Sequence, residues 1–188
     1  MTIIAGLDLE TTGLDWATGH RIIEVAAILY SDDGTKMGGF VKRINPERAI
    51  DPKAHAVHGI SFEDLAMEPK WSEIAPKLHA VLSRCDQVVA HNGIGFDVPF
   101  LAHEFKREGL SLPSCLHHCY DTMVDGRWAT PMGKLPNLGE LCFATEVSYD
   151  PGAAHAADYD VDVMMQAFFA ARKWGYFQSI THREVDAA

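Results

Sequence analysis

The chain has 188 residues, of which 47% are hydrophobic and 22% are charged, as is typical of one globular domain. Its formal net charge of −10 excludes a protein that grips long nucleic acid through many phosphate contacts, because that mode of binding needs a basic surface. No apolar run approaches the roughly 18 residues of a membrane span, so we expect no membrane partner. The N-terminus starts directly with strand-like sequence and has no basic region ahead of an apolar core, so we expect no signal peptide. Four cysteines without regular spacing favour a reduced protein in the cytoplasm.

The first half of the chain predicts three successive strands, followed by a loop and a short helix. The strands are expected at residues 2–9, 22–30 and 36–44. The turn Asp32-Asp33-Gly34 joins the second strand to the third, as in an antiparallel hairpin. Residues 54–60 are predicted to form a loop. The stretch Ser61-Phe62-Glu63-Asp64 has the pattern of a helix cap.

The second half predicts strands that alternate with helices. The expected helices cover residues 71–82, 96–105, 135–143 and 158–174. The expected strands cover residues 87–90 and 115–120. We expect the polar tail from Thr181 to be loose. Together the two halves predict an α/β fold with one mixed sheet covered by helices, in a single domain over residues 1–188 whose core spans about 2–175.

The most informative stretch is residues 3–14, in which an apolar run leads into two carboxylates and a Thr-Thr-Gly turn. Successive side chains of a strand point to opposite faces, so Asp8 and Glu10 project from the same face. Two neighbouring carboxylates repel each other, and a divalent cation such as Mg²⁺ or Mn²⁺ between them removes that cost. From this stretch alone, a solvated strand end is the alternative interpretation.

Two further segments place carboxylates and histidines where loops enter helices. Asp97 follows His91-Asn92-Gly93 at a predicted helix start, and Asp160 follows His155 at another. Taken singly, each acid has a simple structural explanation. Asp97 would complement the helix dipole, and Asp160 would cap its helix.

Taken together, the three segments form an ordered motif set. The chain reads Asp8-x-Glu10-x-Thr12-Gly13, then His91-Asn92-x-x-x-Phe96-Asp97, then His155-x-Ala157-x-x-Asp160. This set resembles the DEDD exonuclease superfamily in its histidine-bearing branch, DEDDh. The tyrosine branch would need a tyrosine four residues before the last aspartate, where this chain has Ala156.

Within the DEDDh branch, the sequence is most similar to the exonuclease domain of the proofreading epsilon subunits of bacterial DNA polymerase III. The similar stretches are Asp-Leu-Glu-Thr-Thr-Gly-Leu from residue 8, Val57-His58-Gly59-Ile60, and Leu-Gly-Glu-Leu-Cys at 138–142. The resemblance runs in order over residues 3–174. It implies a ribonuclease H-like fold, a five-stranded mixed sheet flanked by helices.

The resemblance also implies a function. We expect a metal-dependent 3′→5′ exonuclease that releases nucleoside 5′-monophosphates from single-stranded or frayed 3′ ends of DNA. Its partners would be a nucleic acid 3′ end, DNA rather than RNA, and a DNA polymerase. The alternatives are an RNA 3′-trimming exonuclease of the same family and a non-catalytic, polymerase-associated module that binds nucleic-acid ends.

The resemblance assigns roles to individual residues. Two Mg²⁺ or Mn²⁺ ions would be held by four carboxylates, Asp8, Glu10, Asp97 and Asp160. His155 would be the general base that takes the proton of the attacking water. The residues implied near the terminal nucleotide are Thr11, Thr12, Leu14, His58, Asn92 and Phe96. For Phe96 the alternative is core packing, and for His58 and Asn92 it is a hydrogen bond that fixes a loop. Asp121 matches a recurring family position and is expected to be structural.

Overall fold

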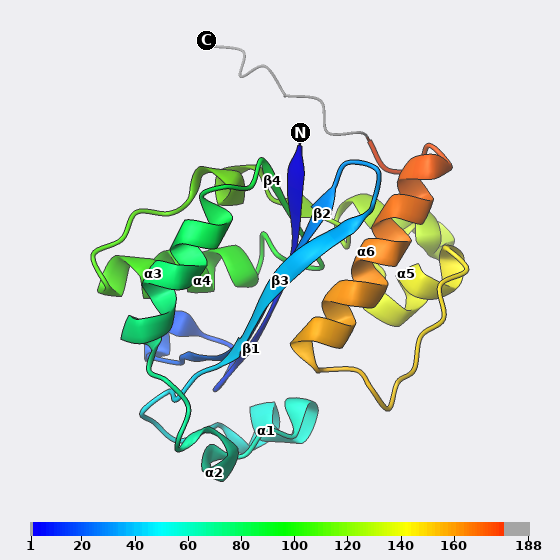
Figure 1. The fold of residues 1–188 in the computed structure, drawn as a ribbon. Coiled ribbons are helices and arrows are strands. Elements are labelled where there is room, and N and C mark those ends of the chain that lie inside the picture. The colour runs from blue at the N-terminus through cyan, green and yellow to red at the C-terminus, as the bar shows by residue number, and fades with distance from the viewer. Residues whose placement is uncertain (1, 179–188) are drawn as a thin grey trace.

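A five-stranded mixed sheet lies at the centre of the computed structural model, which describes residues 2–178 (Figure 1). The strands are β1 (Ile3–Thr11), β2 (Ile22–Ser31), β3 (Lys36–Arg43), β4 (Gln87–Ala90) and β5 (Tyr120–Asp121). They lie in the order β3-β2-β1-β4-β5. β1 and β3 pair antiparallel with β2, whereas β4 pairs parallel with both β1 and β5. The predicted sheet is therefore confirmed.

Helices cover both faces of this sheet and the end of β1. The α-helices are α1 (Pro52–His58), α2 (Phe62–Leu65), α3 (Trp71–Leu82), α4 (Asp97–Arg107), α5 (Leu138–Ala144) and α6 (Ala157–Lys173). The 3-10 helices are η1 (Trp16–Thr18), η2 (Ser114–His118), η3 (Asp125–Ala129) and η4 (Pro131–Gly133). In Figure 1, α3 and α4 lie to the left of the sheet, α5 and α6 lie to the right, and α1 and α2 lie below it. None of the helices within residues 2–178 has both the length and the apolar character needed to span a lipid bilayer.

The side chains of β1 alternate between two hydrophobic cores. Ala5 and Leu7 belong to the core built with α3 and α4, whereas Ile4 belongs to the core built with α6. Gly6 also faces α6, because a Cβ there would lie 2.6 Å from Met165 and 2.8 Å from Val161. The missing side chain lets α6 approach β1 closely, just before β1 reaches its acidic residues.

Several helices and strands begin and end at the predicted residues or within one residue of them. Residues 71–82 form α3 and residues 87–90 form β4, as expected. The predicted cap at Ser61 is a complete capping box, because the Asp64 backbone N–H donates to the Ser61 hydroxyl and the Ser61 N–H donates to the Asp64 carboxylate. The longest helix begins and ends within one residue of the predicted range 158–174.

Two predictions were wrong, and the tail cannot be compared. The predicted loop at 54–60 is mostly helix α1, which Asp51 caps at its start and Gly59 ends with a φ of 70°. The predicted strand at 115–120 is mostly the 3-10 helix η2, and β5 has only two residues. The buried residues Cys115 and Leu116 are adjacent rather than alternating, which suits a helical turn and not a strand. The tail from Thr181 lies outside the described residues.

Candidate active site

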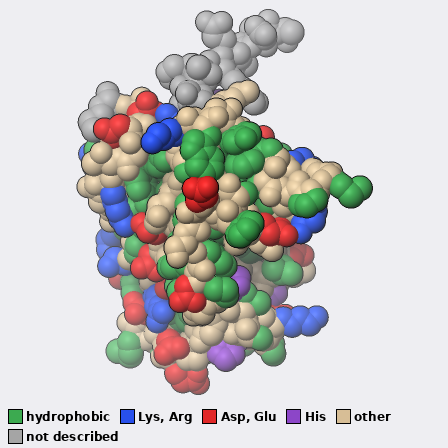
Figure 2. Space-filling view, turned by 90° about the vertical axis from the view of Figure 1, so that its right-hand side faces the viewer, with side chains coloured by type: hydrophobic (Ala, Val, Ile, Leu, Met, Phe, Trp, Pro, Cys, Tyr) green, Lys and Arg blue, Asp and Glu red, His purple; other side chains and the backbone are tan. Residues whose placement is uncertain are grey.

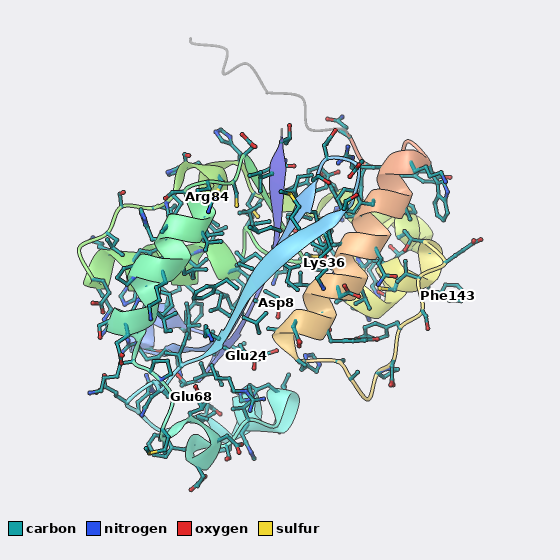
Figure 3. All side chains as sticks on the ribbon, viewed as in Figure 1. Asp8, Glu24, Lys36, Glu68, Arg84 and Phe143 are labelled. Carbon is teal, nitrogen blue, oxygen red and sulfur yellow. The ribbon has the colours of Figure 1, made fainter. Side chains whose placement is uncertain are left out.

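Asp8 and Glu10 lie on the face of β1 that α6 covers, as their alternation with Leu7 and Leu9 requires. Figure 3 shows Asp8 between the sheet and the first turn of α6, with Glu24 nearby. Burial raises the pKa of Asp8 well above its usual range, and the charges of neighbouring carboxylates raise it further. Burial and nearby carboxylates, Asp160 first among them, raise the pKa of Glu10 to about 8.

Asp160 reaches the same place from the first turn of α6. It is 9% exposed, and burial raises its pKa despite a hydrogen bond that favours its charged form. That bond runs from the His155 backbone N–H to Asp160 Oδ2 over 3.0 Å. The second oxygen, Oδ1, is buried without a hydrogen-bond partner within residues 2–178. Asp160 therefore carries an oxygen that the folded chain leaves unsatisfied.

Asp97 is the first residue of α4 and is 2% exposed. Burial raises its pKa to about 8, although a hydrogen bond from the Leu9 backbone opposes the shift. Its Oδ1 is also buried without a hydrogen-bond partner among the described residues. The charges of Asp97 and Asp160 both raise the pKa of Asp8, so these three carboxyl groups lie close enough to interact electrostatically. We refer to the four side chains Asp8, Glu10, Asp97 and Asp160 as the acidic cluster.

A fully bonded carboxylate, Asp121, fixes the turn that leads to Asp97. Asp121 is 3% exposed at the end of β5, and its oxygens accept hydrogen bonds from four backbone N–H groups. The donors are Asn92, Ile94, Met123 and Val124, at distances of 3.0 to 3.2 Å. Two of these donors lie in the turn between β4 and α4. Asp121 is therefore structural, as the sequence suggested, and it sets the start of α4.

His155 lies in the loop before α6 and is exposed. Its φ of 64° is unusual for a residue other than glycine, and its backbone hydrogen bond to Asp160 accompanies that conformation. Ligand atoms of Glu10, His155 and Asp160 all lie within 4.8 Å of one another. The structure therefore brings the predicted histidine to two of the four predicted carboxylates, Glu10 and Asp160.

The donor set of the acidic cluster fits divalent cations. Carboxylate oxygens are the ligands that Mg²⁺ and Mn²⁺ prefer, and the four carboxyl groups on β1, α4 and α6 interact electrostatically, with Glu10 and Asp160 within 4.8 Å of each other. Two buried oxygens, on Asp97 and Asp160, have no hydrogen-bond partner in the described chain. A cation beside them would satisfy both oxygens and offset the repulsion that raises the pKa values.

Glu24 is a buried carboxylate at the site that the sequence analysis did not select. It lies directly opposite Glu10 in the antiparallel pairing of β1 and β2. It accepts hydrogen bonds from Arg43 Nε over 2.9 Å and from the Ala157 backbone N–H over 3.2 Å. Glu24 thus caps α6 from a neighbouring strand, because the residue at the N-cap of α6, Ala156, has no side chain that could do so. The sequence signal for Glu24 was that it is an isolated charge inside the apolar run of residues 22–30.

In the turn that follows β1, the two threonine side chains are buried and the Leu14 side chain is exposed. The Thr11 hydroxyl donates to the Gly13 carbonyl over 2.8 Å, and the Thr12 hydroxyl lies 3.0 Å from His20 Nδ1. Both threonines are buried, so their hydroxyl groups fix the turn itself. Leu14, by contrast, is 84% exposed and is available to a ligand.

The other three residues implied near the nucleotide occupy separate segments. His58 ends α1, where its Nδ1 accepts from the Ile60 N–H and its buried Nε2 has no partner among the described residues. Asn92 is exposed with a φ of 65°, and its backbone N–H bonds to Asp121. Phe96 packs on Phe100, with ring centroids 5.0 Å apart, and is partly buried against the core. This contact supports the interpretation of Phe96 as a residue that packs into the core.

Among residues 2–178, basic side chains do not form a continuous band on the face that carries α5 and α6 (Figure 2). Figure 2 shows Lys and Arg side chains scattered among acidic and apolar ones on this face, with histidines in its lower half, toward α1. The exposed Phe143 of α5 points away from the acidic cluster, on the outer side of the molecule (Figure 3). This distribution agrees with the net charge of −10.

Comparison with known sequences places this geometry in a family context. The model of the exonuclease family RNase_T matches residues 5–168. DNA polymerase III subunit epsilon of Escherichia coli (strain K12) is 30% identical over 170 residues, which cover 87% of this chain and 69% of that protein. The same subunit of Rickettsia conorii is 35% identical over 165 residues, which cover 86% of this chain and 70% of that protein.

Solved structures of exonuclease I share the fold. One superposes with a TM-score of 0.80 at 20% identity, covering 92% of this chain and 41% of exonuclease I. A complex of the E. coli enzyme with a dT13 oligonucleotide has a TM-score of 0.79 at 18% identity, over 94% of this chain and 43% of that chain. A zinc-bound complex of that enzyme with single-stranded DNA has a TM-score of 0.80 at 19% identity, over 93% and 41%. The chain therefore spans about two fifths of exonuclease I, and at these identities the likeness concerns the fold.

Proposed function

Because the chain belongs to the exonuclease family, we propose that it is a metal-dependent 3′→5′ exonuclease acting on single-stranded or frayed 3′ ends of DNA. Its products would be nucleoside 5′-monophosphates. The observation that carries the proposal is the acidic cluster with His155 beside it, in which two buried carboxylate oxygens have no partner among the described residues. A purely structural set of acids would have its oxygens bonded.

The acidic cluster would hold two Mg²⁺ or Mn²⁺ ions. When bound, such ions stabilise negative charge on a phosphodiester and lower the pKa of a water molecule. The four carboxylates match the charge of two divalent cations. Their positions on β1, α4 and α6 are set by packed elements, so the ligands are pre-arranged before a cation arrives.

His155 would act as the general base. Its ring makes no hydrogen bond to any residue in the described part of the chain, and it is exposed beside Glu10 and Asp160. Its ring nitrogens are thus available to accept a proton from a water molecule at the cluster. The bond from its backbone N–H to Asp160 holds it at the edge of the cluster without occupying the ring.

DNA is the proposed substrate because the relatives at 30% and 35% identity are named as subunits of a DNA polymerase. The exonuclease I complex with dT13 agrees with a single-stranded DNA substrate. For the same reason, a DNA polymerase is the proposed protein partner. RNA trimming and end binding without turnover are alternative outcomes of the experiment that follows.

The proposal is tested with a substrate panel and product identification. Single-stranded DNA, duplex DNA with and without a terminal mismatch, and RNA of matched sequence are incubated with Mg²⁺, with Mn²⁺ or with EDTA. We expect monophosphates to be released fastest from single-stranded and mismatched DNA and not at all in EDTA. Binding without release, release undiminished by Asp8→Ala, or a preference for RNA would each contradict the proposal.

Two matched variants on α6 separate the cluster from its surroundings. Asp160→Asn should abolish release, whereas Asp162→Asn should retain it. Asp162 lies two residues away and faces Lys36 and Gln166 at the surface. His155→Gln should lower kcat by about 10²- to 10⁴-fold and remove one limb of the pH–rate profile. An unchanged profile in His155→Gln would contradict the role of general base.

A further inference from the structure

A partly exposed aromatic surface continues from the turn that follows β1. Leu14 is 84% exposed, and Trp16, two residues later in η1, is 39% exposed. The Trp16 ring packs on His103 of α4, with ring centroids 5.2 Å apart and planes tilted by 34°. We call Leu14, Trp16 and His103 the Trp16 surface. None of these contacts takes part in the chemistry proposed for the acidic cluster.

The Trp16 surface is held rigidly to α4. The loop that carries it ends at Arg21, whose guanidinium donates to both carboxylate oxygens of Glu104, at 2.7 and 3.1 Å. Glu104 is fully buried on α4, next to His103. At its other end the loop is fixed by Thr12, whose backbone N–H donates to the Arg21 carbonyl over 2.8 Å. A ligand would therefore meet a pre-formed surface, which lowers the entropy cost of binding.

Two other tryptophans serve as comparisons, because Trp71 is buried in the core and Trp174 is exposed at a distance from the acidic cluster. Trp71 is 2% exposed, and its indole N–H donates to the Glu104 carbonyl, so its role in the core is complete. Trp174 is 44% exposed but follows the last turn of α6, about 20 Å along the helix from Asp160. Trp16 combines an exposure similar to that of Trp174 with a position beside the proposed nucleotide turn.

The charge of the protein favours stacking as the way to hold a strand. At a net charge of −10, affinity from many phosphate contacts is small, whereas stacking of a base on an aromatic ring needs no positive surface. One cation does lie near: Arg48 donates to the Gly19 carbonyl at the end of η1. It has no carboxylate within ion-pair distance among residues 2–178, so its charge is available to one phosphate.

We propose that the Trp16 surface is a stacking subsite for a base on the 5′ side of the terminal nucleotide, with Arg48 beside the adjoining phosphate. The inference rests on the proposed exonuclease function and adds a binding site for the remaining strand. A base can lie on Trp16 only when it has left its own helical stack. The subsite would therefore favour single-stranded or frayed ends.

The test is a cycle that combines protein variants with abasic substrates. Oligothymidylates carry an abasic residue at the terminal, second or third position from the 3′ end, and KM is measured for wild type, Trp16→Ala and Trp174→Ala. We expect an abasic residue at the second or third position to raise the wild-type KM by about tenfold, and to have no further effect in Trp16→Ala. Trp174→Ala should behave like wild type. An abasic terminal residue should raise KM equally in all three proteins.

Additional readouts separate stacking from folding and from the proposed function. Trp16→Phe keeps an aromatic ring on His103 and should retain most of the effect, so a loss of folding in Trp16→Ala leaves the test intact. Equal abasic effects in wild type, Trp16→Ala and Trp16→Phe would overturn the subsite while monophosphate release continued. If no protein released monophosphates, the proposed function would fail first.

Discussion

The buried carboxylates of this molecule fall into two groups. Glu104 and Asp121 have their oxygens bonded, to two arginine side chains and to four backbone N–H groups respectively. In the acidic cluster, Asp97 and Asp160 each leave a buried oxygen without a partner within residues 2–178. The pKa of every member of the cluster is raised, with burial as the first cause.

This difference separates structural acids from acids that await a ligand. A bonded carboxylate such as Asp121 lowers the free energy of the fold on its own, because its hydrogen bonds offset its desolvation. The acidic cluster raises the free energy of the fold until a cation arrives, because four carboxyl groups are buried together with too few hydrogen-bond donors to stabilise their charged forms. Bonded acids also position the cluster: Asp121 sets the start of α4, and Glu24, which accepts hydrogen bonds from Arg43 and from the Ala157 N–H, sets the start of α6.

The largest expected effect comes from neutralising the most crowded member of the cluster. Asp8→Asn should lower kcat by at least about 1,000-fold, because it removes a ligand aimed at the reacting charge. In metal-free protein the same change should raise the free energy of unfolding, because it removes a carboxylate that burial and four neighbours disfavour. Urea denaturation in EDTA measures this. A metal-free Asp8→Asn protein less stable than wild type would contradict the comparison.

A bonded acid should respond in the opposite direction. Glu104→Gln leaves Arg21 and Arg107 without their shared carboxylate and should lower the free energy of unfolding by about 3 kcal/mol. Because Glu104 lies outside the cluster, the loss should be the same in EDTA and in Mn²⁺. Denaturation of both proteins under both conditions checks this. A loss that depends on the metal would show that Glu104 belongs with the cluster.

An intermediate effect is expected where a bonded acid supports the cluster. In Asp121→Asn one oxygen becomes an amide that cannot accept the bond from the Ile94 N–H, which loosens the turn before Asp97. We expect the affinity for Mn²⁺ and the activity to fall by about 10- to 100-fold. Titration of activity against Mn²⁺ concentration measures this. If Asp121→Asn reached full activity at saturating Mn²⁺ but bound Mn²⁺ more weakly, the whole effect would come from the placement of the metal ligands.

The smallest effect is a dependence of metal-free stability on pH. Glu10 and Asp97 have pKa values of about 8 in the folded protein, against about 4 in an unfolded chain. Between these values the unfolded state binds fewer protons, so the free energy of unfolding should fall as pH rises from about 4.5 to about 8. Urea denaturation in EDTA at pH 5, 6.5 and 8 should show this decline, and saturating Mn²⁺ should reduce it. A rise across this range in EDTA would contradict the raised pKa values.

Sequence patterns predicted most of the sheet, because strands depend on local signals, whereas the resemblance to DEDDh exonucleases assigned the members of the acidic cluster. The alternation in β1 and the loop-to-helix positions of Asp97 and Asp160 are visible in single segments, but each segment alone also fits a structural role. Helix α1 was missed because it has seven residues and buries none of them, so it has no apolar period. Its signature was nevertheless present, with Asp51 before Pro52 and Gly59 after the last turn.

Other features depend on pairing between segments, which one segment cannot reveal. Glu24 is opposite Glu10 only because β1 and β2 pair in one register, and a shift by one residue would turn it to the other face. The bonds of Asp121 join β5 to a turn about 30 residues earlier in the chain. The contact between Trp16 and His103 likewise joins η1 to α4. Long-range hydrogen bonds of this kind satisfy both oxygens of the bonded acids, Glu104 and Asp121, and so distinguish them from the members of the acidic cluster.

The most direct test of the central claim is the number of protons that metal binding releases. The claim is that Glu10 and Asp97 of the acidic cluster are held largely protonated near neutral pH until cations bind. Calorimetric titration of Mn²⁺ at pH 7, in buffers of different ionisation enthalpy, reports the protons displaced. Because Glu10 and Asp97 have pKa values of about 8, we predict release of about one proton or more per protein. Binding without proton release at pH 7 would contradict the claim.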